Sequence, residues 1–464
     1  MNLEIKILCR ILIGIYVMVL AACVGVADTY QSPELDLPAV PDGVKQKISN
    51  TPWWLSFNDE ALAGWIEDAL KNNWDLAKVR ARMDEARASL GSAEALKTPR
   101  LDGAVEVSGT RRKFGSNTTS DEFNGVTRTA TVGLSLGWEL DVWGRVDQMN
   151  QSAKARFMSS ELMRDATALS VAGLVADTYF QWRTLETKYQ TTKDAIVQLQ
   201  TISDLEKRRW QAGLGTELSY KQSLAELRSV QAKLPLLEDA KGRSAVALQV
   251  LAGRAPRDLD SHMASAMTVT SVPDIPELLD TQILLRRPDV AAAEWNLKAA
   301  YSDVNASRAE RYPRLSLSVV TGLLTSNSSW VSGTPSWLDT GLSATAPVWD
   351  GGMAVSKIDA STARRANAKA HYHQSVLQAY RDLQEAVLSQ KTSDMQFNLI
   401  QSELMLREQT LEFVQKSYVA GQKNLYEVLS EKIKVLQAQL ALSDAQQAQL
   451  LSRTRFYKAI GGGL

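Results

Sequence analysis

The sequence predicts an internally duplicated membrane protein of the mixed α+β class, in which short paired β-strands alternate with very long α-helices. Three observations lead to this prediction: an internal repeat, segments in which apolar residues alternate with small or polar ones, and two proline-free helical segments of about 66 residues each. The composition is that of an ordered chain, since 45% of the 464 residues are apolar and 22% are charged.

The N-terminal residues have the features of a secretory signal peptide. Two basic residues precede the run Ile11–Ala22, which contains no charge. Such a run is too short to cross a bilayer as a helix, but it suits the apolar region of a cleaved signal. We therefore expect residues 1–22 to be absent from the mature chain.

Cys23 directly follows this run and is a candidate site of lipid attachment. Leu20-Ala21-Ala22-Cys23 resembles the bacterial lipobox, whose cysteine receives diacylglycerol before the signal is cleaved. The alternative is ordinary cleavage near Ala21-Ala22, which would leave Cys23 as a free thiol. The residue that follows the cysteine is Val24 and not an aspartate. By resemblance to lipoprotein sorting, this favours delivery to the outer membrane. Residues 23–50 are then a lipid-anchored N-terminal extension.

An internal repeat divides the rest of the chain. Lys71–Leu101 aligns without gaps with Leu285–Leu315. Two later landmarks recur in the same order, which chance similarity would not preserve. They are Val142-Trp143-Gly144 with Val348-Trp349-Asp350, and Trp210–Gly213 with Tyr418–Gly421. We expect a first structural repeat over residues 51–260, a linker over 261–281 and a second repeat over 282–464.

Each repeat is predicted to begin with a helix and to continue with paired strands. Asp59–Lys97 and Asp289–Glu310 are rich in alanine and in interspersed charges, and they stop before Pro99 and Pro313. Alternation follows, as in Ala130–Leu140, where every second residue is apolar. The pattern predicts four strands of about ten residues, in two hairpins. The hairpin loops are expected at Thr110–Val126 and Thr325–Asp339.

An unusually long helix is predicted after each hairpin. Val146–Gln211 and Met353–Ala420 contain no proline, and each would form roughly 100 Å of α-helix. Each ends at an Ala-Gly pair, after which a further helix of about 35–40 residues returns. Pro235 predicts a kink in the first return helix. Coiled-coil spacing in the second return helix, which we interpret as helix–helix packing, occurs at Leu425, Leu429, Ile433, Leu436 and Leu440.

The strand pattern is typical of a transmembrane β-barrel, although a soluble sheet with one wet face has the same pattern. The export signal favours the barrel. Four strands cannot close a barrel, and each backbone group left unpaired at an open edge in lipid costs several kcal/mol. The membrane interpretation therefore requires an oligomer: two chains would give eight strands and a filled interior, and three would give twelve strands and room for a pore.

Five motifs occur in a fixed order along this duplicated chain: Trp138–Arg145, Leu285–Val290, Ala309–Leu317, Pro347–Gly352 and Tyr418–Gly421. Together with the lipobox they resemble the outer-membrane factor (TolC-like) channels of Gram-negative efflux systems, especially the lipoprotein branch that serves drug-efflux pumps. The resemblance covers essentially the whole mature chain. It implies a homotrimer with a twelve-stranded outer-membrane β-barrel, continued by a long periplasmic α-barrel of coiled-coil helices.

The resemblance also implies a function and its partners. The chain would be a passive exit duct whose far tip opens when a periplasmic adaptor and an inner-membrane efflux pump, expected to be proton-driven, engage it. Drugs or other small toxic compounds are the expected cargo; polypeptide secretion of type I and heavy-metal efflux are the alternatives. A passive tube has no substrate pocket from which the cargo can be read.

The resemblance places two groups of candidate site residues at the ends of the long helices. The adaptor-contacting hairpin tips are Gly213, Leu214, Gly215, Thr216, Gly421, Gln422, Lys423 and Asn424. Tyr418, Lys423 and Glu427 match residues that constrict the closed end in some relatives, and the alternative is a solvated helix end. The match is partial, because Ser219 and Ser430 replace acidic residues of those relatives. Glu217 is the remaining acidic candidate to pair with Lys423.

Other classes of function are disfavoured by the residues. Lys+Arg and Asp+Glu number 52 each, so no basic field calls for nucleic acid. Three histidines and two cysteines exclude a Cys/His zinc cluster, and His371 and His373 point to different faces of their helix. We therefore expect no enzyme activity, no metal and no cofactor besides the lipid on Cys23. A structural trimeric coiled-coil lipoprotein is the second alternative, but it explains neither the strands nor the duplication.

Overall fold

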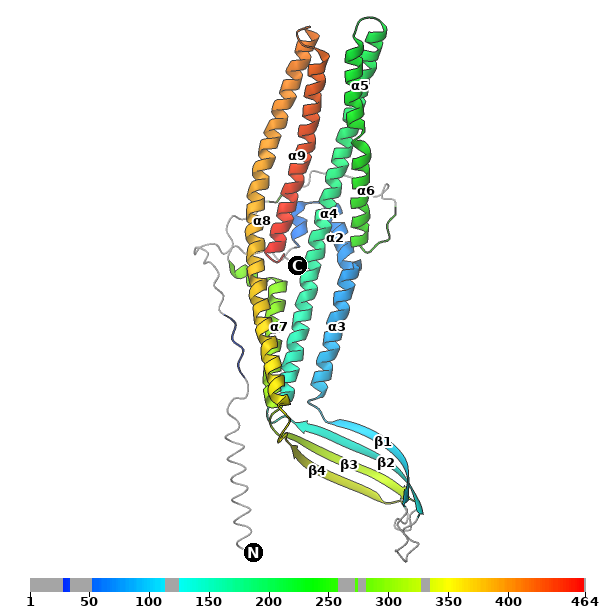
Figure 1. Cartoon of the computed structure of the whole chain (residues 1–464), viewed down its shortest axis with the longest axis vertical. Helices are drawn as coiled ribbons and strands as arrows, with labels where there is room; N and C mark the ends of the chain where they lie inside the picture. Colours follow the sequence, from blue (N-terminus) through cyan, green and yellow to red (C-terminus); the bar gives the residue numbers. More distant parts are fainter. Residues whose placement is uncertain are drawn as a thin grey trace, which may run out of the picture. The chain divides into compact units, whose positions relative to one another are not determined.

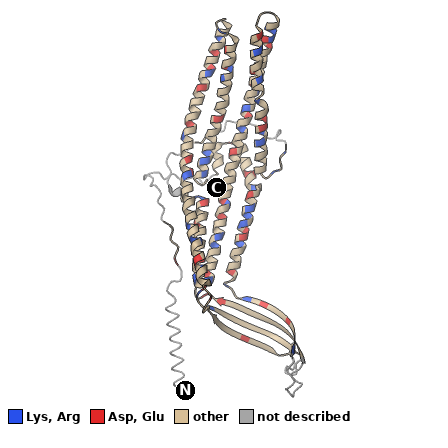
Figure 2. Cartoon of the chain, viewed as in Figure 1, with Lys and Arg blue, Asp and Glu red and all other residues tan. Residues whose placement is uncertain are grey.

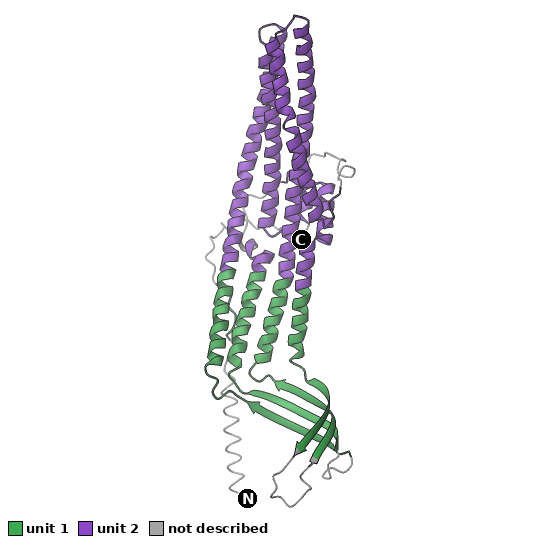
Figure 3. Ribbon diagram, turned by 45° about the vertical axis from the view of Figure 1, so that its right-hand side comes forward, with its two compact units in different colours: residues 1–34, 83–160, 292–372 green, residues 35–82, 161–291, 373–464 purple. Residues whose placement is uncertain are grey.

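The computed structural model describes residues 28–33, 52–112, 125–257, 272–273, 281–326 and 334–462 of the 464. The predicted signal peptide, Cys23 and most of the predicted linker 261–281 lie outside the described residues. The chain forms two compact units (Figure 3), each built from both halves of the sequence. The first unit comprises residues 1–34, 83–160 and 292–372, and the second comprises residues 35–82, 161–291 and 373–464.

The elements follow the predicted order (Figure 1). They are a 3₁₀-helix η1 (Trp53–Phe57), α2 (Glu60–Asn72), α3 (Trp74–Ala95), β1 (Arg100–Arg112), β2 (Gly125–Leu140), α4 (Arg145–Gln211), α5 (Glu217–Gln231), α6 (Leu234–Leu251), a 3₁₀-helix η3 (Thr281–Arg286), α7 (Pro288–Ala309), β3 (Arg314–Ser326), β4 (Ser336–Thr345), α8 (Met353–Val419) and α9 (Leu425–Ala459). Among the helices of these described residues, none has both the length and the apolar content required to cross a lipid bilayer.

The four strands of the first unit form one antiparallel sheet in the order β1-β2-β3-β4, so the prediction of four strands in two hairpins is confirmed. The strands extend into the predicted loops, since β1 reaches Arg112 and β2 begins at Gly125. Apolar residues pair in register on one face, as in Val105 with Val132 and Leu317 with Leu342. Charged side chains are sparse on the strands and dense on the helices (Figure 2), as the alternating pattern predicts.

Each β-hairpin leads into a long helix through a turn, and the side chain of an aspartate in that turn caps the helix. The Asp141 carboxylate accepts hydrogen bonds from the backbone N–H groups of Val146 (2.9 Å) and Asp147 (2.7 Å). In the second repeat, Asp350 accepts from Gly352 (2.9 Å) and Ala354 (2.8 Å), and these bonds lower the pKa of Asp350. Gly144, Gly351 and Gly352 have positive φ, a conformation that glycine adopts without strain.

Two helices that were predicted to be continuous are each interrupted, so these two predictions were wrong. The first breaks between α2 and α3 at Asn73, whose ψ is 132°. The Asn73 side chain accepts from the N–H of Asp75 at 2.8 Å and donates to the carbonyl of Leu251 at 2.8 Å, so the break is held by a residue distant in sequence. The first return helix separates into α5 and α6, and Pro235 lies in the first turn of α6 rather than at a kink.

The second unit has a core in which short elements pack on the long helix α4. Phe57 and Phe180 pack with ring centroids 5.2 Å apart, and Trp53 stacks on Tyr457 at 5.7 Å. A hydrogen bond lies at the edge of this core: the Tyr179 hydroxyl of α4 donates to the carboxylate of Asp59 at 3.0 Å.

A buried arginine explains one motif of the sequence. Arg287 pairs with Asp289 at 2.8 Å and with Asp382 at 3.1 Å, and it donates to the carbonyl of Ala459 at 3.1 Å. Its side chain is only 7% exposed, so removing either carboxylate would leave the buried positive charge of Arg287 only partly neutralised. The motif Leu285–Val290 therefore fastens α7 to α8 and α9 within the second unit.

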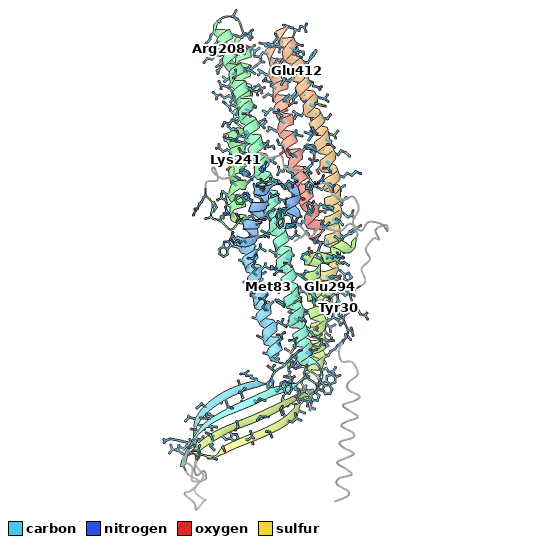
Figure 4. The ribbon with its side chains drawn as sticks, turned by 180° about the vertical axis from the view of Figure 1, so that it is seen from behind. Tyr30, Met83, Arg208, Lys241, Glu294 and Glu412 are labelled. Atoms are coloured by element: carbon cyan, nitrogen blue, oxygen red, sulfur yellow. The ribbon has the colours of Figure 1, made fainter. Side chains whose placement is uncertain are left out.

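The described N-terminal residues lie along helices of the first unit. The Tyr30 hydroxyl donates to Glu294 at 3.0 Å, and the two side chains are labelled beside each other in Figure 4. Asp28 pairs with Arg308 at 2.7 Å, and its backbone exchanges hydrogen bonds with the Asn305 side chain. The hydrogen bond from Arg308 lowers the pKa of Asp28. The segment is thus fixed by both charge and hydrogen bonds.

Candidate functional site

The two helix hairpins of the second unit, α4–α5 and α8–α9, end in turns of the same construction. At the first tip, Gly213 has φ of 72° and the N–H of Leu214 donates to the carbonyl of Arg209 at 2.8 Å. At the second, Gly421 has φ of 74° and Gln422 donates to Ser417 at 2.9 Å. Both are the helix ending that a left-handed glycine permits. The predicted positions of the two turns are confirmed.

Each return helix begins at a capped residue next to the turn. The Thr216 hydroxyl accepts from the N–H of Ser219 at 3.1 Å. The Asn424 side chain accepts from the N–H of Glu427 at 3.0 Å, and the Glu427 carboxylate accepts in return from the N–H of Asn424. This capping box fixes Glu427 in the first turn of α9.

Apolar side chains are exposed at both tips. Leu214 is 75% exposed and Val419 is 86% exposed, and Leu218 and Tyr426 are exposed as well. Apolar residues so exposed beside rigid, capped turns are typical of a surface that binds another protein.

Tyr418 connects the two hairpins within one chain. Arg209, in the last turn of α4, donates from Nη1 to the Tyr418 hydroxyl at 2.7 Å. The same nitrogen lies 3.2 Å from the carboxylate of Glu206, a residue that is only 3% exposed. A charged donor held by a buried carboxylate makes this hydrogen bond stronger than one between neutral groups. Tyr418 is therefore a point at which α8 is fastened to α4.

Lys423 and Glu427 form an ion pair inside the second hairpin. The Lys423 ammonium donates to the Glu427 carboxylate, and both side chains are about one-third exposed. This hydrogen bond, followed by that from the backbone of Asn424, lowers the pKa of Glu427 from its usual 4.5. Glu427 therefore stays ionised at neutral and mildly acidic pH, and the ion pair is lost only as the pH falls below that range.

The acidic partner of Lys423 within the chain is Glu427, and not Glu217, the candidate that the sequence left open. Glu217 pairs with Lys221 at 2.9 Å, so within the chain it does not replace the missing acidic partner of Lys423. Among the contacts of the described tips, Ser219 forms hydrogen bonds only with the Thr216 hydroxyl, through its own backbone N–H and its own hydroxyl. Sequence reasoning missed Arg209. The available signal was its position next to Trp210, which the repeat aligns with Tyr418.

Comparisons with known proteins agree with this architecture. A family described as "Outer membrane efflux protein" matches residues 65–254 and 279–462. The pyoverdine export outer membrane protein OpmQ of Pseudomonas putida is 30% identical over 422 residues, which cover 90% of this chain and 89% of the relative. The toluene efflux pump outer membrane protein TtgI of Pseudomonas putida is 27% identical and covers 88% of this chain and 86% of its own.

The fold is also that of a solved channel. The Campylobacter jejuni CmeC outer membrane channel superposes with a TM-score of 0.84 at 24% identity, covering 95% of each chain. The predicted fold class is thereby confirmed. The family match spans most of the sequence, and the chain therefore belongs to the outer membrane efflux protein family, whose members are ducts in the outer membrane of Gram-negative bacteria.

Proposed function

We propose that the protein is the homotrimeric exit duct for drugs or other small toxic compounds, which a proton-driven inner-membrane pump delivers through a periplasmic adaptor. The observation that supports a duct most directly is the four-stranded sheet, whose outer strands β1 and β4 each have one side unpaired in the described part of the chain. Three such sheets close a twelve-stranded barrel with a pore, whereas one sheet in lipid leaves two rows of unpaired backbone groups.

The cargo is proposed from the relatives, one of which is named for pyoverdine export and one for toluene efflux. Both names refer to small molecules, which favours small-molecule efflux over polypeptide secretion and over heavy-metal efflux.

Deleting the gene from its host tests the cargo. We expect the minimum inhibitory concentrations of hydrophobic drugs and solvents to fall severalfold and to recover when the gene is restored on a plasmid. Discharging the proton gradient while ATP is maintained should stop the export. Unchanged drug and solvent tolerance, with loss of silver or copper tolerance or of a secreted polypeptide, would contradict the proposal.

The tip residues form the proposed gate and adaptor surface. Tyr418, Lys423 and Glu427, joined by Arg209, would hold the second hairpin of each protomer inward until the adaptor engages the tips at 213–216 and 421–424. In support, the Arg209–Tyr418 hydrogen bond joins α4 to α8 and would oppose any opening that separates these two helices. A hydrogen bond to a charged group stabilises a structure by about 1.5–3 kcal/mol, and a trimer contains three copies.

Tyr418→Phe is expected to increase resting conductance in planar bilayers, because it removes the acceptor of the Arg209 hydrogen bond. A loss of about 1.4 kcal/mol corresponds to roughly tenfold in the closed-to-open equilibrium. Arg209→Ala should raise the conductance at least as much, because it also removes the ion pair of the buried Glu206, and Tyr418→Phe should add little to Arg209→Ala in the double variant. Lys416→Ser is the matched control, because Lys416 forms an exposed ion pair with Glu412 within α8. Unchanged conductance in both single variants would show that the constriction lies elsewhere.

The lipid anchor is proposed at Cys23. The described residues Asp28 and Tyr30 are bound to helices of the first unit, and an extended chain from Cys23 to Asp28 spans at most about 18 Å. An acyl chain on Cys23 would therefore stay close to that unit.

Labelled palmitate should be incorporated into the protein and lost in Cys23→Ser. Cys9→Ser should retain the label, because residue 9 lies in the predicted signal peptide. We expect Cys23→Ser to remain in the outer membrane, since a closed barrel holds itself in lipid without an acyl chain. Label that persists in Cys23→Ser would contradict the assignment.

A further inference from the structure

Two apolar residues beyond the end of β4 are fully open to solvent in the chain. Val348 is 100% exposed and Trp349 is 89% exposed. An indole that stays exposed beside an edge strand does not gain the favourable free energy of burying its apolar surface. Both residues belong to the motif Val348-Trp349-Asp350, which the internal repeat aligns with Val142-Trp143-Gly144. The contacts of the first copy of the motif therefore indicate the contacts expected of the second.

The counterpart of Trp349 in the first repeat is Trp143, and that residue is docked. Its Nε1 donates to the carbonyl of Pro313 at 2.7 Å. Its ring stacks on Tyr312 with centroids 5.1 Å apart and an interplanar angle of 24°. Trp143 thus joins the turn after β2 to the turn before β3, the strand that pairs with β2.

The repeat alignment assigns an equivalent acceptor to Trp349. Trp143 aligns with Trp349, and Tyr312-Pro313 aligns with Thr98-Pro99, the turn before β1. In the sheet order, however, β4 and β1 are the two opposite edges. The equivalent contact therefore requires the β1 edge of a second copy.

We propose that Trp349 docks on the Thr98-Pro99 turn of the neighbouring copy of this chain, with its indole N–H donating to the Pro99 carbonyl. The inference rests on the homotrimer of the proposed function and adds the contact that fixes how adjacent copies join. Thr98 replaces Tyr312, so the new contact has the hydrogen bond and apolar packing without a ring stack.

Anchored at Trp143 and Trp349, the same alignment also predicts the register between β4 and the neighbouring β1. The registers of the two hairpins differ by two residues under this alignment, and a shift of that size at the interface would place Val107 opposite Leu342 instead. Within the chain, Leu136 of β2 pairs with Val319 of β3. Their counterparts are Leu342 and Val105, which then lie opposite each other across the interface. Leu342 is 69% exposed and Val105 is 74% exposed in the single chain.

Two features agree with this register. Leu342 pairs with Leu317, and Val105 pairs with Val132, so both lie on the apolar face; a slip by one residue would place apolar against polar faces. Asp339, the charged residue of β4, falls opposite Ser108. No acidic residue of β1 then lies directly opposite Asp339, where like charges are destabilising, although Glu106 is its diagonal neighbour on the same face.

Cysteine cross-linking of the full chain in mild detergent tests the proposal, in a background with both Cys9→Ser and Cys23→Ser, which removes the two native cysteines. Leu342→Cys with Val105→Cys should oxidise to a covalent trimer on denaturing gels, because directly opposite residues lie within disulfide reach. Leu342→Cys with Val107→Cys is the shifted control and should cross-link at least tenfold less.

The turn contact is tested in the same way with a short bifunctional thiol reagent. Trp349→Cys with Thr98→Cys should give covalent trimers, whereas Trp143→Cys with Tyr312→Cys should lose its thiols and remain a monomer on the gel. In the otherwise unmodified chain, Trp349→Leu should lower the temperature at which the native oligomer dissociates, while Trp74→Leu, at an exposed tryptophan of α3, should not.

The outcomes separate this inference from the proposed assembly. A native trimer that cross-links through Val107 instead of Val105, or whose Trp349→Cys does not link to Thr98→Cys, would overturn the docking. A folded protein whose native mass is not that of a trimer would overturn the proposed function itself.

Discussion

Backbone hydrogen bonding in lipid is the constraint on which the rest of this structure depends. Each chain provides four paired strands, and among the described residues the outer side of β1 and of β4 has no partner. Lipid offers no donors or acceptors, so a sheet of this kind is stable in a membrane only when other copies supply the missing edges. The duplicated sequence suits this requirement, because the junction inside one chain provides the pattern for the junction between chains.

The duplication extends from the sheet to the hairpin tips, but there the two copies differ in chemistry. Both tips use a left-handed glycine and a side-chain cap. Only the second has an ion pair and a capping box in the same turn, and only its tyrosine accepts a hydrogen bond from the other hairpin. Two tips with the same turn geometry and unequal bonding favour the proposed gate, in which the second hairpin would move and the first would support it.

Most of the fold could be predicted because its signals are local and periodic. The absence of proline marks α4 and α8, and alternation marks the strands. The breaks in the helices could not be predicted in the same way. Asn73 interrupts a helix because its side chain reaches the distant carbonyl of Leu251. The site was predictable in position, since glycines mark the tips, but Arg209 depends on a contact between residues 209 and 418 that no local pattern contains.

The native mass of the detergent-solubilised protein tests the central claim most directly, that one chain is an incomplete barrel. Light scattering coupled to size exclusion, corrected for bound detergent, should give three times the mass of the mature chain, with no folded monomer on dilution. A stable, folded monomer that conducts ions in planar bilayers would contradict the account, because it would show that four strands close a pore without a second copy.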